Sequence, residues 1–366
     1  MMPFIDLQRQ YRENRAEIDR QIHEVLDSSA YILGPKVEQI ETRLAEFAGV
    51  RHAVGVSSGT DALLLALMAL GIGPGDEVVT TPFTFIATAE VVALVGARPV
   101  FADIEEDTYN IDAADVERKI TGRTRALMPV DLFGQCADYA RLAEVAARKG
   151  LPIIEDAAQS FGAEQDGRRA GSFGAIGCTS FYPAKPLGCY GDGGMVLTDS
   201  DELADVVRSL HVHGQGADRY EHVRVGICGR LDALQAAVLL GKLPRFAWEI
   251  EQRQRLAARY SEALAGAAVT PVVRPGNTSV WAQYCVRVPD RDGVQARLRE
   301  AGVATAIFYP KPLHLQEAFA HLGGGRGDCP VSEAVAQDII ALPMHAYMDE
   351  RTQDGIVAAV RAAVRG

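Results

Sequence analysis

The feature that most constrains the fold is an alternation of short apolar runs with helical patterns between residues 52 and 155. Predicted strands lie at 52–56, 77–80, 99–103, 125–130 and 152–155, and predicted helices lie between them at 62–70, 86–95, 113–120 and 139–149. Strands that alternate with helices of about ten residues are typical of βα units. The pattern therefore predicts an α/β fold with a mostly parallel sheet.

The remainder of the chain predicts a helical N-terminal segment and a second, smaller unit. Helical patterns occupy 12–27 and 37–48; strands at 175–181 and 194–198 precede helices at 201–211, 231–240 and 246–265. From about residue 267, strands are predicted at 281–288 and 304–308, with helices at 292–301, 332–341 and 351–364. We expect a large domain of residues 1–250 and a small α/β domain of residues 251–366.

The net charge and the apolar runs argue against several classes of protein. The formal net charge is −11 without any basic run, which disfavours nucleic-acid binding. The longest apolar run, residues 62–70, is far shorter than the about 20 residues that cross a membrane. Charged residues from Asp6 to Glu13 stand where a signal peptide is apolar. We expect a cytoplasmic enzyme or binding protein.

Cysteine and histidine spacing predicts no metal site. The six cysteines include no CxxC pair, and the histidines at 211, 213 and 222 lack a second cluster that would complete a ligand set. We expect reduced and mostly buried thiols, with Cys228 as the exception.

Four features together predict a pyridoxal 5′-phosphate (PLP) site. Residues 57–61 (SSGTD) lie between a strand and a helix, where backbone N–H groups bind phosphate, although a plain helix cap has the same sequence. Asp156 ends a predicted buried strand and could hold a pyridine nitrogen protonated, or could simply cap the next segment. Gln159 follows it and could bond a ring substituent.

Lys185 and Ser180 complete this set. Lys185 is the only charged residue between Arg169 and Asp192, and an amine in apolar surroundings has the lowered pKa that suits a Schiff-base nucleophile. The alternative is a surface lysine with a buried stem. A dinucleotide site is disfavoured, because the glycine-rich residues 71–76 follow a helix rather than a strand.

Several motifs resemble the DegT/StrS family of nucleotide-sugar aminotransferases. They are residues 83–88 (FTFIAT), 155–160 (EDAAQS), 180–185 (SFYPAK) and 191–194 (GDGG), and the likeness extends from 4–7 (FIDL) and 31–35 (YILGP) to 342–345 (LPMH). The resemblance implies the aspartate aminotransferase fold, fold type I, in a homodimer or higher assembly with shared active sites.

The resemblance also implies roles for individual residues. Lys185 carries the cofactor and moves the proton, Asp156 pairs with the ring nitrogen and Gln159 with the ring hydroxyl. Phe85 stacks on the ring, and the phosphate contacts Gly59, Thr60, Ser180 and, from the partner subunit, position 228. Relatives usually have Asn at this position, whereas this chain has Cys228, and a thiol is a weaker donor than an amide. Substrate binding is expected of Tyr31, Phe83, Tyr182, Arg230, Tyr309 and His314.

Within the family, residues 130–138, 185–190 and 230–235 look most like enzymes that aminate UDP-2-acetamido-2-deoxy-3-oxo-glucuronate with L-glutamate for surface polysaccharide such as O-antigen. The alternatives are another nucleotide-linked keto-sugar, such as a 3- or 4-keto-6-deoxy hexose, or a sugar dehydratase. Dehydratase relatives carry histidine at the lysine position, so Lys185 favours transamination. A non-catalytic regulator would be expected to lose Asp156 or Lys185, and both are present.

Overall fold

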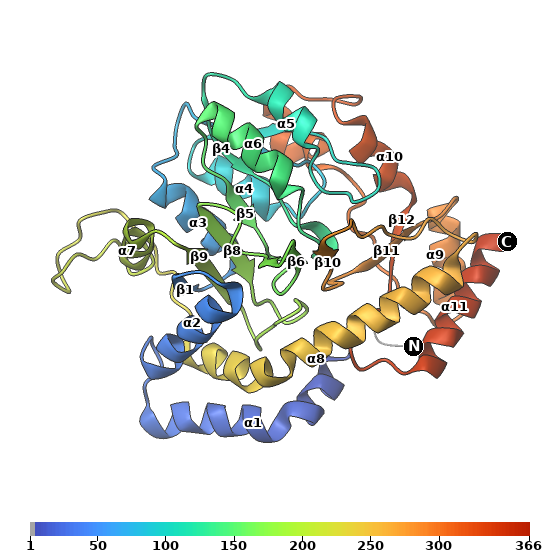
Figure 1. Cartoon of the computed structure of the whole chain (residues 1–366), viewed down its shortest axis with the longest axis horizontal. Helices are drawn as coiled ribbons and strands as arrows, with labels where there is room; N and C mark the ends of the chain where they lie inside the picture. Colours follow the sequence, from blue (N-terminus) through green and yellow to red (C-terminus); the bar gives the residue numbers. More distant parts are fainter. Residues whose placement is uncertain (1–3) are drawn as a thin grey trace.

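The computed structural model describes residues 4–366 and places a mixed sheet at its centre (Figure 1). The strands of this sheet are β1 (His52–Val56), β2 (Glu77–Thr80), β3 (Arg98–Phe101), β4 (Thr124–Met128), β5 (Ile154–Asp156), β8 (Ile176–Ser180) and β9 (Gly194–Thr198). Pairing and two bridges between β4 and the β5 region give the order β3-β2-β4-β5-β8-β9-β1. Only β9 pairs antiparallel with its neighbours. The predicted mostly parallel sheet is confirmed.

Helices cover both faces of this sheet, because alternate residues of its strands point to opposite sides. Val78 and Met128 pack in one core with α3 (Gly59–Ala69), α4 (Ala87–Leu94) and α7 (Asp201–Leu210). Val79 and Leu127 enter a second core with α5 (Ala113–Lys119) and α6 (Tyr139–Lys149). The α3 helix is apolar on most sides and is largely buried, which fixes its N-terminus against the sheet.

One long helix joins the two parts of the molecule. The sequence predicts separate helices at 231–240 and 246–265, but the structure has a single helix, α8 (Ala233–Leu264), with Pro244 inside it. Proline removes one helical hydrogen bond, and packing on both sides of it offsets this loss. The first half packs with α1 (Leu7–Ser28) and α2 (Pro35–Ala48), and residues such as Leu256 and Tyr260 enter the core of the C-terminal part.

The C-terminal part is built around two antiparallel strands, β11 (Tyr284–Arg287) and β12 (Ile339–Leu342). Helices α9 (Arg291–Glu300), α10 (Pro330–Asp338) and α11 (Glu350–Arg365) accompany them; the short elements are β6 (Glu164–Gln165), β7 (Arg168–Arg169), β10 (Asn277–Thr278), η1 (Leu132–Gly134), η2 (Leu313–Leu315) and η3 (Glu317–Leu322). Two predictions are wrong here. Residues 304–308 form no strand beyond a bridge from Ala306 to Ala341, and the predicted helix at 332–341 ends at Asp338, where β12 begins.

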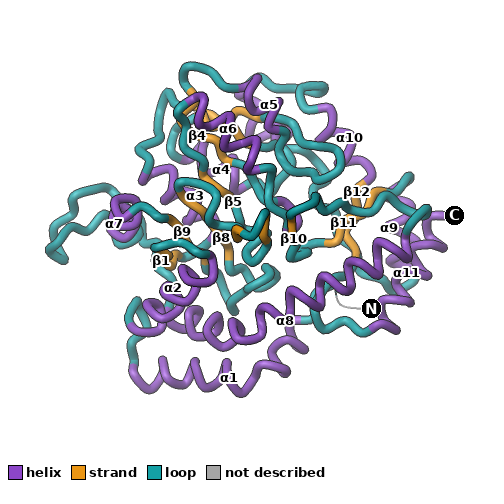
Figure 2. The backbone as a smooth tube through the Cα atoms, in the orientation of Figure 1, coloured by secondary structure: helices purple, strands orange, loops and turns teal. Residues whose placement is uncertain are grey.

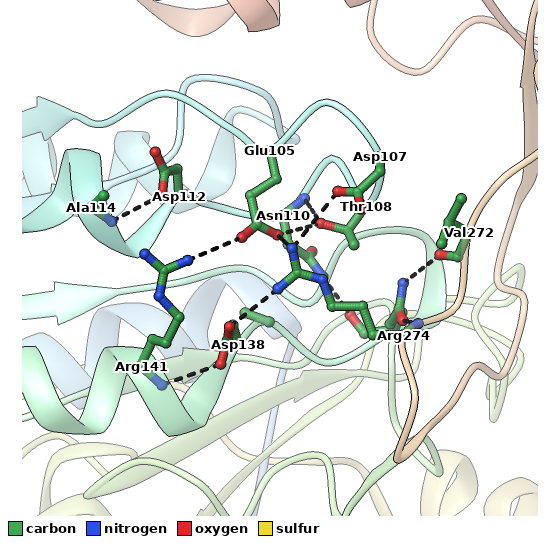
Figure 3. Close-up of polar contacts among 12 residues, drawn as sticks. Glu105, Asp107, Thr108, Asn110, Asp112, Ala114, Asp138, Arg141, Val272 and Arg274 are labelled. Carbon is green, nitrogen blue, oxygen red and sulfur yellow. Dashed lines mark hydrogen bonds and ion pairs between the residues drawn. The ribbon is translucent and has the colours of Figure 1, made fainter.

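Arg274 ties the segment that follows α8 to the large sheet (Figure 3). Its guanidinium lies 2.8 Å from a carboxylate oxygen of Glu105 and 3.1 Å from one of Asp138, and Asp107 is near. Its backbone N–H donates to Gln135 Oε1 at 2.8 Å. The two parts are therefore joined by polar contacts as well as by the continuous helix.

The proposed division into residues 1–250 and 251–366 remains a proposal, and its first three residues lie outside the described part of the chain. Along α8, the buried residues change from the core shared with α1 to the C-terminal core between Ile250 and Leu256. This change of core supports a boundary inside the helix.

Candidate active site

The site lies at the edge of the sheet where the parallel strands end. Because β1, β2, β5 and β8 run in one direction, the residues after them gather at the same edge. They bring together the start of α3, the segment before α4, Asp156 and Ser180.

Gly59 approaches Ser180 closely at the place where a phosphate site is predicted. Ser58 caps α3 by accepting the N–H of Asp61 at 3.0 Å, and Gly59 and Thr60 form the first turn of that helix. A Cβ on Gly59 would lie 2.6 Å from Cβ of Ser180, so only glycine lets the helix and the strand end meet this closely. The free N–H groups of a helix start and nearby hydroxyls fit a phosphate.

Asp156 is buried at the end of β5 and is only 4% exposed. Its Oδ2 accepts a hydrogen bond from Thr88 Oγ1 at 2.8 Å, and its Oδ1 accepts one from the N–H of Ala158 at 3.1 Å. Burial raises the pKa of Asp156, while these two donors and the charge of Lys185 act to lower it. The carboxylate is therefore held by fixed donors in a low-dielectric site.

Lys185 follows β8 and is partly buried. Burial lowers the pKa of its amine to about 8, and the charge of Asp156 partly opposes this shift. With this pKa, roughly a tenth of the amine is neutral at pH 7, far more than for an ordinary lysine, and the neutral amine is the form that attacks a carbonyl. The structure places an amine and a carboxylate of matching chemistry in one site.

Gln159, Tyr309 and Phe83 form a connected group beside them. Gln159 Oε1 accepts the N–H of Phe133 at 3.0 Å, and its Nε2 donates to the Tyr309 hydroxyl at 3.1 Å. The rings of Phe83 and Tyr309 meet edge to face, with centroids 6.1 Å apart. Tyr309 thereby connects the C-terminal part of the chain to the sheet edge.

Three predicted aromatic residues are exposed to solvent in the single chain. Phe85 is 56% exposed, Tyr182 55% and Tyr31 45%. Tyr182 lies in the same loop as Lys185, and Phe85 lies between Phe83 and α4. Tyr31 accepts the N–H of Ala233 through its carbonyl, which places it beside the start of α8. Exposed rings of this size are available for a ligand or for another chain.

Cys228 and Arg230 lie on a segment that runs past the start of α3. The carbonyl of Gly229 accepts the N–H of Ser57 at 2.9 Å, and Arg230 forms an antiparallel β-bridge with Val56. Cys228 is exposed, unlike the other five free cysteines, and its sulfur accepts a hydrogen bond from the Arg230 guanidinium at 3.0 Å. The expectation that Cys228 differs from the other thiols is confirmed.

His314 has side-chain contacts elsewhere. Its Nε2 bonds Glu333 at 3.1 Å and its ring packs near Phe101, so the structure does not join it to Lys185 or Asp156. Its neighbour Leu313 donates its N–H to the carbonyl of Pro82, which precedes Phe83. The predicted substrate role of His314 stays a prediction.

The sequence interpretation missed the hydroxyls of Thr84 and Thr88. Both lie in the motif at 83–88, yet no role was assigned to them. Their spacing of four residues across a helix start, beside exposed Phe85, is the signal that could have drawn attention to them. Both side chains are buried; Thr88 donates to Asp156, and Thr84 contacts Thr88.

The residues present fit PLP. A helix start with adjacent hydroxyls suits its phosphate, a buried carboxylate suits its ring nitrogen, and a lysine of lowered pKa suits its carbonyl. The roles of the individual residues stay predictions.

Comparison with known proteins agrees with this fit. A sequence model described as the DegT/DnrJ/EryC1/StrS aminotransferase family matches residues 12–361. The chain is 49% identical over 361 residues to a Pseudomonas aeruginosa protein named UDP-2-acetamido-2-deoxy-3-oxo-D-glucuronate aminotransferase, covering 98% of this chain and 99% of that protein.

Two solved structures are similar over nearly their whole length. A DegT/DnrJ/EryC1/StrS aminotransferase from Brucella abortus has a TM-score of 0.96 and 47% identity, with 100% of both chains covered. DesV from S. venezuelae, solved in complex with a ketimine intermediate, has a TM-score of 0.97 and 43% identity, covering 100% of this chain and 98% of that chain. The predicted fold type I architecture and PLP cofactor are confirmed. The chain belongs to the DegT/DnrJ/EryC1/StrS aminotransferase family and is a PLP-dependent aminotransferase.

Proposed function

We propose that this enzyme transfers the amino group of L-glutamate to the 3-keto carbon of UDP-2-acetamido-2-deoxy-3-oxo-glucuronate. The single observation that supports this substrate most is the 49% identity, over nearly the full length of both chains, to the Pseudomonas aeruginosa relative named for it. The product would be a diamino sugar acid for surface polysaccharide such as O-antigen, made in the cytoplasm. None of the helices in residues 4–366 is both long and apolar enough to span a membrane.

Bound PLP would supply an electron-withdrawing ring that takes up electrons from the reacting carbon and carries the amino group between the two substrates. Lys185 Nζ would hold the cofactor at rest and move the proton at the substrate carbon. Its lowered pKa supports both tasks, since the amine can then gain and lose a proton near neutral pH.

Asp156 would keep the ring nitrogen protonated, and its two hydrogen-bond donors support an ionised carboxylate there. Gly59, Thr60 and Ser180 would bind the phosphate. Gln159 would contact the ring hydroxyl, and its bond to Tyr309 fixes the orientation of its amide. Phe85 would stack on the ring, in keeping with its exposed position in the single chain.

Arg230 would bind the carboxylate of the sugar acid in the active site of a second subunit. A guanidinium pairs with a carboxylate through two parallel hydrogen bonds, which lysine does not reproduce. Cys228 would lie beside the cofactor phosphate in the same way. We propose a homodimer with shared sites, in which Tyr31, Phe83, Tyr182, Tyr309 and His314 complete the substrate pocket.

A panel of nucleotide sugars tests the substrate. The purified enzyme is mixed with ¹⁵N-labelled L-glutamate and either the UDP-linked 3-keto sugar acid, its uncharged 3-keto counterpart, or dTDP-linked 3- and 4-keto-6-deoxy hexoses, and products are analysed by mass spectrometry. We expect ¹⁵N in the sugar acid and far less in the others. Preferential labelling of another sugar would overturn the substrate, and loss of water without labelling would indicate a dehydratase.

A further inference from the structure

Two threonine hydroxyls form a chain that ends on the Asp156 carboxylate. Thr88 Oγ1 lies 2.8 Å from Asp156 Oδ2, and Thr84 Oγ1 lies 3.3 Å from Thr88 Oγ1. Thr84 and Thr88 are 2% and 1% exposed, so water does not compete for either hydroxyl. The chain begins in the segment before α4 and ends at the strand β5, across the sheet edge.

The direction of this chain follows from counting protons. An ionised carboxylate only accepts, so the single hydroxyl proton of Thr88 points to Asp156. The lone pairs of Thr88 are then free to accept the proton of Thr84. Each bond polarises the next, and a bond to a charged acceptor is stronger than one between neutral groups.

A threonine just before a helix commonly caps it by accepting a backbone N–H, but the Thr84 hydroxyl does not do so here. The first turn of α4 has Ile86 at its cap position and no side-chain cap. Thr84 therefore does not cap α4, and its hydroxyl contacts that of Thr88 instead.

The titratable groups that face Asp156 do not by themselves keep its carboxylate ionised, so hydrogen-bond donors are needed. Lys185 carries a positive charge only when protonated, Cys178 lies directly opposite Asp156 on β8, and Tyr309 faces it from the C-terminal part. Burial raises the pKa of Asp156 and so favours its neutral acid. A neutral acid does not hold a pyridine nitrogen protonated. The hydrogen-bond donors to Asp156 therefore decide whether Asp156 can keep the ring nitrogen of the cofactor protonated.

We propose that Thr88, supported by Thr84, is a positioning residue that keeps Asp156 ionised and directed at the ring nitrogen of the cofactor. This inference depends on the proposed role of Asp156. It predicts that removing one buried hydroxyl changes the ionisation of a residue on another element.

The test replaces Thr88 by Val, which has nearly the same shape and no hydroxyl. Binding of pyridoxamine 5′-phosphate to the full-length apoenzyme is measured by calorimetry from pH 5 to 9. Binding needs the ionised carboxylate, so affinity is present above the pKa of Asp156 and is lost as pH falls through it. We expect Thr88→Val to move this loss upward by about one to two pH units and to weaken binding roughly tenfold at neutral pH.

Three further variants separate ionisation from packing. Thr88→Ser keeps the hydroxyl and should restore the original pH profile. Thr84→Val should shift the profile in the same direction by less, and it tests the chain even if Thr88→Val does not fold. Thr80→Val is the matched control: Thr80 is fully buried on β2 and donates to the carbonyl of Met128 at 2.7 Å, so its loss should leave the profile unchanged.

An unchanged profile in folded Thr88→Val, or a shift that Thr88→Ser fails to correct, overturns the inference. Asp156→Asn distinguishes this failure from failure of the proposed function. If Asp156→Asn abolishes the pH dependence and Thr88→Val does not alter it, only the role of Thr88 is wrong. If Asp156→Asn also leaves the pH profile unchanged, the proposed role of Asp156 is wrong.

Discussion

Two parts of the proposed site differ in how they are built. The part around Asp156 and Lys185 is set into the sheet edge, and the Asp156 carboxylate has hydrogen-bond donors within the same chain. The segment between α7 and α8, residues 211–232, is a long loop that extends from the body of the molecule (Figure 2). It carries the exposed Cys228 and the half-buried Arg230.

This loop has few contacts with the rest of the chain at its outer end. Isolated β-bridges from Val212 to Cys228 and from Gln215 to His222 join the two sides of the loop. The apolar side chains of its outer part face solvent, with Val225 90% and Tyr220 82% exposed, whereas Leu231 near its end is buried. A chain that buries Asp156 and exposes apolar side chains of this loop is consistent with the proposed second subunit covering the loop. The region around Asp156 is thus formed within one chain, whereas the loop is available for contact with a second chain.

The largest effect is expected from the buried part. Lys185→Ala should lower turnover by roughly 1,000-fold or more, since loss of an acid–base group alone costs about 10²–10⁴ and covalent attachment of the cofactor is lost as well. The visible absorbance band of the covalent link between the cofactor and the lysine should disappear. Retained multiple turnover at an appreciable rate would contradict the assignment of Lys185.

A smaller loss is expected from Asp156→Asn, on the order of 100-fold in kcat. The amide cannot keep the ring nitrogen protonated, so the ring draws electrons less strongly. Circular dichroism checks that the variant folds, and single-turnover reaction with glutamate isolates the step. Near-normal turnover would mean that Asp156 only caps the segment that follows it.

The pH dependence of cofactor attachment tests the burial of Lys185. Its amine has a pKa of about 8, and the neutral amine is the nucleophile, so the attachment rate should rise with pH and level off above pH 8. The free amine of Nα-acetyl-lysine amide is the control, because its rate should continue to rise toward pH 10. A matching profile for enzyme and control would show that Lys185 behaves as a surface lysine.

The smallest effect is expected from the exposed part. Cys228→Asn introduces a stronger donor than the thiol and should tighten PLP binding by about 2- to 10-fold, measured by equilibrium dialysis. Cys228→Ala is the control and should not tighten it. Equal affinity in all three proteins would place position 228 away from the cofactor phosphate.

Local patterns predicted most strands of the large sheet but failed where distant contacts decide the structure. The strand β2 lies where the apolar run places it, because its residues are buried on both faces. The helix α8 continues through Pro244 because its two halves pack in separate cores. A prediction from local sequence does not take such packing into account. Residues 339–341 belong to a predicted helix, yet pairing with β11 makes residues 339–342 a strand.

The site shows the same division. Lys185 and Asp156 were predictable because a lone charge in an apolar stretch and an acid at a strand end are visible in sequence. Thr88 reaches Asp156 from 68 positions away, and a buried hydroxyl leaves no periodic pattern. The contacts of His314 with Glu333 likewise depend on the tertiary fold.

Subunit exchange between two inactive variants tests most directly whether the buried and exposed parts belong to different chains. Lys185→Ala and Arg230→Ala homodimers are mixed, exchange is followed with differently tagged subunits, and amination of the sugar acid is measured. If Arg230 acts in the partner's site, one of the two sites in each mixed dimer regains both residues. Since about half of the dimers are mixed after full exchange, the total activity should return to about a quarter of the native value. Confirmed exchange without any recovered activity would contradict the shared site and assign Arg230 to its own subunit.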